Sequence, residues 1–137
     1  MGIGSSSSLT VVTGLILRDL LEIPDMNMVD IALFSQLTEN EYLKTGGGIM
    51  DPFTIAMGKK DYAILLDTSD LSYAYAPLLL PHKKIIITNS GKPRDGVEDY
   101  VRQRRKECAE ALKDLQTVIA IRHLSELTAD VFEEVQE

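Results

Sequence analysis

The sequence predicts an α+β fold, because helical patterns occupy both ends of the chain and extended patterns lie between them. Up to about residue 58, apolar side chains recur at the three- and four-residue spacing of helices. Short apolar and aromatic runs separated by turn residues follow, and helical spacing returns after residue 96. The chain of 137 residues is long enough to bury a core, so we expect residues 1–137 to form a single compact α+β unit.

Two helices are expected near the start of the chain. The first covers about residues 9–22, and either Ser7 or Ser8 can serve as its N-cap, because a serine oxygen accepts hydrogen bonds from the first free N–H groups. The second covers about residues 28–43, with Asn27 as its cap. Its apolar residues fall on one helical face, as in a helix that packs on a core.

Three consecutive glycines, residues 46–48, end this second helix and lead to a single carboxylate. Asp51 and Pro52 then predict the N-cap and the first residue of a short third helix that ends near Gly58. Glycine lets a backbone approach another group closely, so this segment is a candidate binding loop.

The remaining elements follow from changes in the apolar spacing. The first two strands are close enough in the sequence to form a hairpin. In chain order we expect strands over residues 62–66, 71–76 and 84–88, a helix over 97–115, a strand over 118–121 and a helix over 128–136.

Charge and cysteine content exclude several classes of protein. The formal net charge of -7 argues against a broad nucleic-acid surface, because phosphate backbones attract Lys and Arg. No apolar run approaches the ~20 residues of a membrane span. The single cysteine, Cys108, excludes an intrachain disulfide and is typical of a reducing compartment, so we expect a cytoplasmic protein. Cys108 lies in an amphipathic helical stretch, where we expect it to be buried.

The glycine–serine run at the start of the chain predicts a phosphate-binding loop. A helix N-terminus offers unpaired N–H groups and a partial positive charge, and glycines let the backbone approach a phosphate. No Lys follows the glycines, so this is not the common G-x-x-x-x-G-K-[ST] loop. A flexible tail is the alternative interpretation. The candidate phosphate-binding residues are Gly2, Ile3, Gly4, Ser5, Ser6 and Ser7.

Asp51 is the candidate catalytic residue. Phosphoryl transfer needs positioning, charge neutralisation and one group that accepts the proton of the nucleophile. A capping carboxylate at a helix start is the alternative role, and the two roles are compatible. Glu39 lies on what we expect to be an exposed helix end, as a solvated acid.

These two segments together resemble galactokinase, of the kinase superfamily that also includes homoserine, mevalonate and phosphomevalonate kinases. Residues 2–11, G-I-G-S-S-S-S-L-T-V, are similar without a gap to the galactokinase loop G-L-S-S-S-A-S-L-E-V. Residues 38–53, T-E-N-E-Y-L-K-T-G-G-G-I-M-D-P-F, resemble A-E-N-E-F-V-G-V-N-C-G-I-M-D-Q-F. The differences include Ser7 for alanine and Gly47 for cysteine.

The resemblance implies a role for each candidate residue. Asp51 would be the base that takes the proton from the anomeric hydroxyl of galactose or a related sugar, and Gly48 would touch the sugar through its backbone. Ser6 and Glu39 would hold Mg²⁺, and residues 2–7 would wrap the phosphates of ATP.

The resemblance also implies the fold, and two alternative functions remain beside the one it suggests. The family has an N-terminal α+β domain like the second domain of a ribosomal protein, followed by a second α+β domain. We expect this chain to be the central part of such a kinase, with residues 1–80 in one part and 81–137 in the other, inactive alone and able to self-associate. A non-catalytic relative that senses sugar or nucleotide, and a kinase of the superfamily for another small substrate, remain alternatives.

Overall fold

The computed structural model describes residues 4–89, 91 and 97–135. Its contacts divide the chain into two compact units, Met1–Lys92 and Pro93–Glu137, and each is described by itself. The expected assembly of residues 1–137 into one unit, divided near residue 80, stays a prediction. Among the helices of the described ranges, none combines the length and the apolarity that crossing a bilayer requires.

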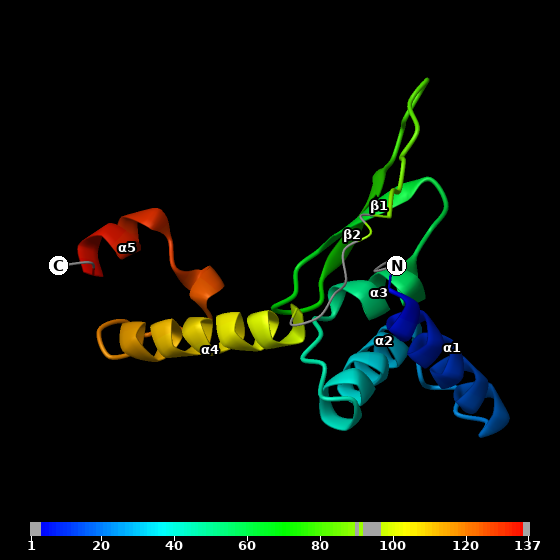
Figure 1. The fold of residues 1–137 in the computed structure, drawn as a ribbon, viewed down its shortest axis with the longest axis horizontal. Helices are drawn as coiled ribbons and strands as arrows, with labels where there is room; N and C mark the ends of the chain where they lie inside the picture. Colours follow the sequence, from blue (N-terminus) through cyan, green and yellow to red (C-terminus); the bar gives the residue numbers. More distant parts are fainter. Residues whose placement is uncertain (1–3, 90, 92–96, 136–137) are drawn as a thin grey trace. The chain divides into compact units, whose positions relative to one another are not determined.

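The first unit contains three helices followed by a hairpin (Figure 1), as the sequence predicts. In chain order its elements are α1 (Ser5–Leu20), α2 (Met28–Leu37), a π-helical extension of α2 (Thr38–Tyr42), α3 (Met50–Met57), β1 (Tyr62–Leu66) and β2 (Tyr73–Pro77).

The predicted cap of α2 is confirmed. The side-chain oxygen of Asn27 accepts hydrogen bonds from the N–H groups of Val29 and Asp30 at 2.8 and 3.1 Å. The Asp30 carboxylate in turn accepts the N–H of Asn27 at 2.9 Å, which completes a reciprocal capping box. Local chemistry therefore sets the start of this helix.

The start of α1 differs from the prediction. The helix begins at Ser5 rather than near residue 9, and Gly4 is its N-cap, with a φ of 71° and no side-chain hydrogen bond. Glycine adopts this left-handed conformation at little cost. Neither Ser7 nor Ser8 is the cap, and the Ser8 hydroxyl instead donates to the carbonyl of Gly4 at 2.8 Å. The serines therefore lie inside the helix.

The start of α3 also differs. Ile49 is the N-cap, so Asp51 is the second helical residue rather than the cap. Ile49 is buried with Phe53, whose N–H donates to the Ile49 carbonyl at 2.9 Å. Burial of these two apolar side chains moves the helix start upstream, and Pro52 is still tolerated because it lies in the first turn.

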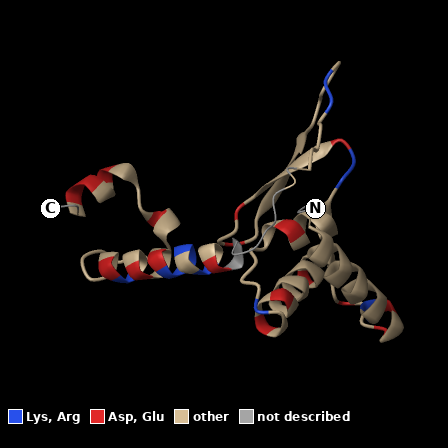
Figure 2. Cartoon of the chain, viewed as in Figure 1, with Lys and Arg blue, Asp and Glu red and all other residues tan. Residues whose placement is uncertain are grey.

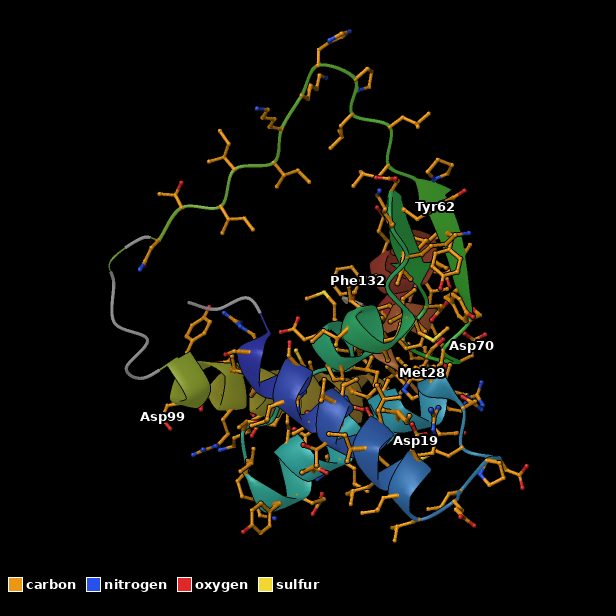
Figure 3. All side chains as sticks on the ribbon, turned by 90° about the vertical axis from the view of Figure 1, so that its right-hand side faces the viewer. Asp19, Met28, Tyr62, Asp70, Asp99 and Phe132 are labelled. Carbon is orange, nitrogen blue, oxygen red and sulfur yellow. The ribbon has the colours of Figure 1, made fainter. Side chains whose placement is uncertain are left out.

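The predicted hairpin is confirmed. Strands β1 and β2 pair antiparallel, with Tyr62 opposite Pro77 and Leu66 opposite Tyr73, so β2 begins two residues later than expected. Figure 3 shows Tyr62 on this hairpin. The Tyr75 hydroxyl donates to the carbonyl of Met57 at 2.6 Å and so fixes the hairpin to the end of α3.

Two predicted strands are wrong. Residues 84–88 form no strand, and Ile86 there is 84% exposed, because no described strand lies beside it to pair its backbone groups. Residues 118–121 also form none. The N–H groups of Val118 and Ile119 donate to the carbonyl of Leu115, so the backbone turns at the end of a helix instead of extending.

A small core joins the elements of the first unit. Ala32 of α2 packs with Ile49 and Phe53 around the start of α3, and side chains of the hairpin cover this cluster. Val11 of α1 and Ile31 of α2 are also buried. The partly buried residues around the cluster are Val29, Ala56, Met57, Ile64, Leu66 and Leu71.

The second unit contains α4 (Val97–Leu115), as predicted, a short 3₁₀ turn (Leu124–Glu126) and α5 (Ala129–Val135), close to the predicted last helix. Figure 2 shows both acidic and basic residues along α4, and ion pairs such as Arg104–Glu107 link successive turns. Cys108 is exposed rather than buried, because α4 presents most of its residues to solvent.

Candidate active site

The candidate base lies beside the start of α1. A Cβ built on Gly4 would lie 3.5 Å from Oδ2 of Asp51 and 3.4 Å from Cδ1 of Ile55. Figure 1 shows the N-terminal end of α1 next to α3. The fold therefore brings together the glycine–serine loop and the carboxylate, which are far apart in the sequence, and leaves no side chain between them at Gly4.

The start of α1 has the electrostatic character of an anion site. The first N–H groups of a helix lack partners within it, and the aligned peptide dipoles place a partial positive charge there. No side chain caps this end, and its first turn contains no acidic residue. Ser5 and Ser6 are exposed in this turn. Their hydroxyls and N–H groups are therefore accessible to a phosphate.

Glu39 is buried and hydrogen-bonded, which corrects the expectation of a solvated surface acid. It is 5% exposed, and its Oε1 accepts a hydrogen bond of 2.9 Å from Oγ of Ser7, itself 2% exposed. The π-helical extension of α2 carries Glu39 one turn beyond Ser35, on the side that faces α1.

Ser7 and Glu39 belong to a polar seam between the two helices, which we define as Ser7–Glu39 and Thr10–Ser35. The hydroxyls of Thr10 and Ser35 form a hydrogen bond across the interface. Further along, a Cβ on Gly14 would lie 3.3 Å from Ile31, so the helices approach closely there. Figure 3 shows the two helices side by side.

Sequence reasoning missed Thr10 and Ser35. The signal was present, since Ser7 and Thr10 are three residues apart and Ser35 and Glu39 are four apart, which places each pair on one helical face. What the sequence does not give is that these two faces meet.

The glycine segment wraps around the same carboxylate. A Cβ built on Gly47 would lie 3.2 Å from Oε2 of Glu39. The Asn40 side chain donates to the carbonyl of Gly47 at 3.0 Å, and Thr45 donates through its N–H and its hydroxyl to the carbonyl of Glu39. Lys44 has a positive φ of 57°, which turns the chain back over the helix end.

The other predicted site residues differ in their exposure and in whether the structure describes them. Gly48 is exposed, and a Cβ there would meet nothing within 4 Å, so the backbone borders open space before α3. Gly2 and Ile3 lie outside the described residues. The structure pairs Glu39 with Ser7 rather than with Ser6, and the roles of these residues stay predictions.

The candidate site contains side-chain oxygens that could bind a divalent cation. Within the described ranges, no group of three or more His, Cys, Asp or Glu side chains is arranged to hold a metal ion. Mg²⁺ in nucleotide sites needs less, because it binds one or two protein oxygens, phosphate oxygens and several waters. A first-turn hydroxyl and the carboxylate of Glu39 are oxygen donors of the type that such a site uses.

Surface grooves of the first unit lie elsewhere. One of about 540 Å³ is on the hairpin, and one of about 480 Å³ follows the outer face of α2. Neither is lined by Gly4 or Asp51.

Comparisons with known proteins identify relatives of this chain. Residues 1–59 match the family model for the N-terminal domain of GHMP kinases. The chain is 46% identical over 136 residues to a galactokinase of Clostridium acetobutylicum, covering 99% of this chain and 35% of the relative. It is 41% identical over 133 residues to a galactokinase of Lactiplantibacillus plantarum, covering 97% and 34%.

A solved structure matches as well. The crystal structure of Lactococcus lactis galactokinase complexed with galactose superposes with a TM-score of 0.88 at 35% identity, covering 98% of this chain and 35% of that one. The chain thus spans about a third of the length of the galactokinases that it matches. Sequence and fold together show that this α+β chain is a homologue of the galactokinases of the GHMP kinase family.

Proposed function

We propose that the chain supplies the phosphate loop and the proton acceptor of a galactokinase-like enzyme, which phosphorylates the anomeric hydroxyl of galactose or a related sugar with ATP. The observation that carries the proposal is the carboxylate of Asp51 beside Gly4, the N-cap of α1. The homology to galactokinases, one of which was solved with galactose, supports the sugar as substrate.

In this proposal ATP binds at the start of α1 and the sugar binds at the start of α3. The terminal phosphate of ATP would lie against the backbone N–H groups of residues 2–7 and the exposed hydroxyls of Ser5 and Ser6, because the buried hydroxyl of Ser7 is bonded to Glu39. Asp51, exposed in the first turn of α3, would accept the proton of the sugar hydroxyl as that oxygen attacks the phosphate. The open space at Gly48 would let the sugar approach the backbone.

The metal would neutralise the phosphate charge. Ser6 and Glu39 are the residues that would hold Mg²⁺, through a hydroxyl and a carboxylate oxygen. When bound, Mg²⁺ supplies charge stabilisation for the transferred phosphoryl group. We also propose that the first unit belongs to a domain like the second domain of a ribosomal protein, that the second unit begins the next α+β domain, and that the protein is cytoplasmic.

The test uses a chimera, because the chain spans a third of its relatives' length. This chain would replace the matching segment of the Clostridium acetobutylicum galactokinase, and sugar phosphate formed from Mg-ATP and galactose would be measured by mass spectrometry. We expect Asp51→Asn to lower the turnover rate by ~10²-fold or more, because the proton acceptor is lost. Asp70→Asn, on the exposed hairpin turn, is the matched control.

Two outcomes would change the proposal. An Asp51→Asn chimera that retains the parent rate would show that another group accepts the proton. A chimera that binds galactose but forms no sugar phosphate would favour a ligand-sensing relative. The observation that motivates this second candidate is Gly47 beside Glu39, at a position where the galactokinase pattern that this chain resembles has cysteine.

A further inference from the structure

Both oxygens of the Glu39 carboxylate lie against specific parts of the chain. Oε1 accepts the hydrogen bond from Ser7, and Oε2 faces Gly47 at a distance that leaves little room for a side chain. None of the ion pairs formed within the described residues involves Glu39. This is therefore a buried acid held by a neutral donor and by close packing.

The Ser7 hydroxyl is suited to fixing this acid. A buried carboxylate needs hydrogen-bond donors, because it has lost its hydration, and a hydroxyl that donates to a charged acceptor forms one of the stronger hydrogen bonds in proteins. Ser7 is itself buried on a helix, so its hydroxyl has few other places to point. Without it, Oε1 would have no side-chain donor in the described structure.

Gly47 restricts the other oxygen. A side chain there would approach Oε2 to 3.2 Å, which is tighter than an ordinary contact, so the carboxylate would have to move by a few tenths of an ångström. The galactokinase pattern that this chain resembles has cysteine at this position and alanine at Ser7. Both differences thus concern residues that lie against the Glu39 carboxylate. Ser7 adds a hydrogen-bond donor, and Gly47 lacks a side chain.

We propose that Ser7 and Gly47 are positioning residues that act as a pair on Glu39: the hydroxyl draws the carboxylate towards α1, and the bare glycine leaves the space that this orientation needs. The proposal deepens the proposed function and rests on it in one respect, namely that Glu39 is a ligand of Mg²⁺. The fixed orientation then sets where Oε2 meets the cation.

The first test is a double-mutant cycle in the 137-residue chain, read by urea unfolding. We expect Ser7→Ala to raise the unfolding equilibrium constant about tenfold, because a buried charged acceptor loses its donor. In the Glu39→Gln background, Ser7→Ala should raise the unfolding equilibrium constant only about threefold, since the acceptor is neutral. Equal effects in both backgrounds would overturn the pairing.

Ser8→Ala is the matched control, because it removes a hydroxyl from the same turn whose bond goes to the Gly4 carbonyl instead. Its effect should be the same in both Glu39 backgrounds.

The second test addresses Gly47, and its comparison of Gly47→Ala with Gly48→Ala does not require Ser7→Ala to fold. Gly47 is outside the positive-φ region, so Gly47→Ala tests space alone. We expect this change to destabilise the chain more with Ser7 present than in Ser7→Ala, where the freed carboxylate can move aside. Gly48→Ala, whose Cβ would meet nothing, is the control for stability. A Gly47→Ala variant as stable as Gly48→Ala would overturn the role of Gly47.

The third test measures nucleotide binding to the galactokinase chimera by calorimetry, with ATP plus Mg²⁺ and with ATP plus EDTA. We expect Ser7→Ala to weaken Mg-ATP binding about tenfold and to leave metal-free ATP binding unchanged, because the loss acts through the carboxylate. Equal weakening in both conditions would mean that Ser7 contacts the nucleotide directly and would overturn the positioning role. Coupling in the cycle, together with Mg-ATP binding that Ser7→Ala leaves unchanged, would retain the pairing and reject the metal assignment of Glu39.

Discussion

Replacing Phe53 by alanine should destabilise the first unit severely and so disturb Asp51. Phe53 is completely buried, packs with Ala32 and Ile49, and meets the ring of Tyr73 edge-on at 5.4 Å between ring centres. It follows Asp51 by two residues on α3, so it is the main anchor of the helix that carries the candidate base.

The expected magnitude follows from burial. Truncating a fully buried Phe costs about 3–5 kcal/mol, because the contacts of the ring are lost and a cavity remains. The edge-to-face pair with Tyr73 places the value in the upper part of this range. A domain is stable by about 5–15 kcal/mol, so much of the margin would disappear. With a urea slope of about 2 kcal/mol per molar, the midpoint should fall by about 2 M.

The assay is urea unfolding followed by circular dichroism. Met50→Ala is the matched control, because Met50 lies on the same helix and is 67% exposed. We expect its effect to stay within about 0.5 kcal/mol. A Phe53→Ala midpoint that matches that of Met50→Ala would refute the reasoning, since α3 would then be held by something other than this ring.

Two further predictions concern local interactions. Asn27→Ala should lower the free energy of unfolding by about 1 kcal/mol, measured by urea unfolding, because the capping box of α2 is lost; no loss would mean that packing alone sets the helix start. Hydrogen bonds from Ser69 lower the pKa of Asp67, so this carboxylate stabilises the fold above its unfolded-state pKa and ceases to do so as the pH falls through the folded value. Ser69→Ala should raise this pKa towards the ordinary value in an NMR titration, and an unchanged pKa would contradict the assignment.

Local chemistry made much of the fold predictable. The cap at Asn27, the hairpin over residues 62–66 and 73–77, and the helix over 97–115 all follow from signals within a few residues of each element. The strand predicted over residues 84–88 does not form, because strand formation depends on more than signals within a few residues. A strand requires a neighbour, and apolar spacing alone does not provide one.

The candidate site was predictable in kind but not in arrangement. The glycine–serine loop and Asp51 were identified from their residue types and their order in the chain. The burial of Glu39 was not, because an acid after a helical run is solvated by default, and only the packing of α2 on α1 removes it from water.

The sequence by itself identified the candidate residues for the chemistry and the helical or extended character of most segments, because propensities, caps and turn residues act over a few neighbours. The tertiary structure alone decided that Gly4 lies beside Asp51 and that Ser7, rather than Ser6, holds Glu39. The physical reason is that a helical period states which residues share a face, whereas the partner of that face is selected by burial across the whole unit.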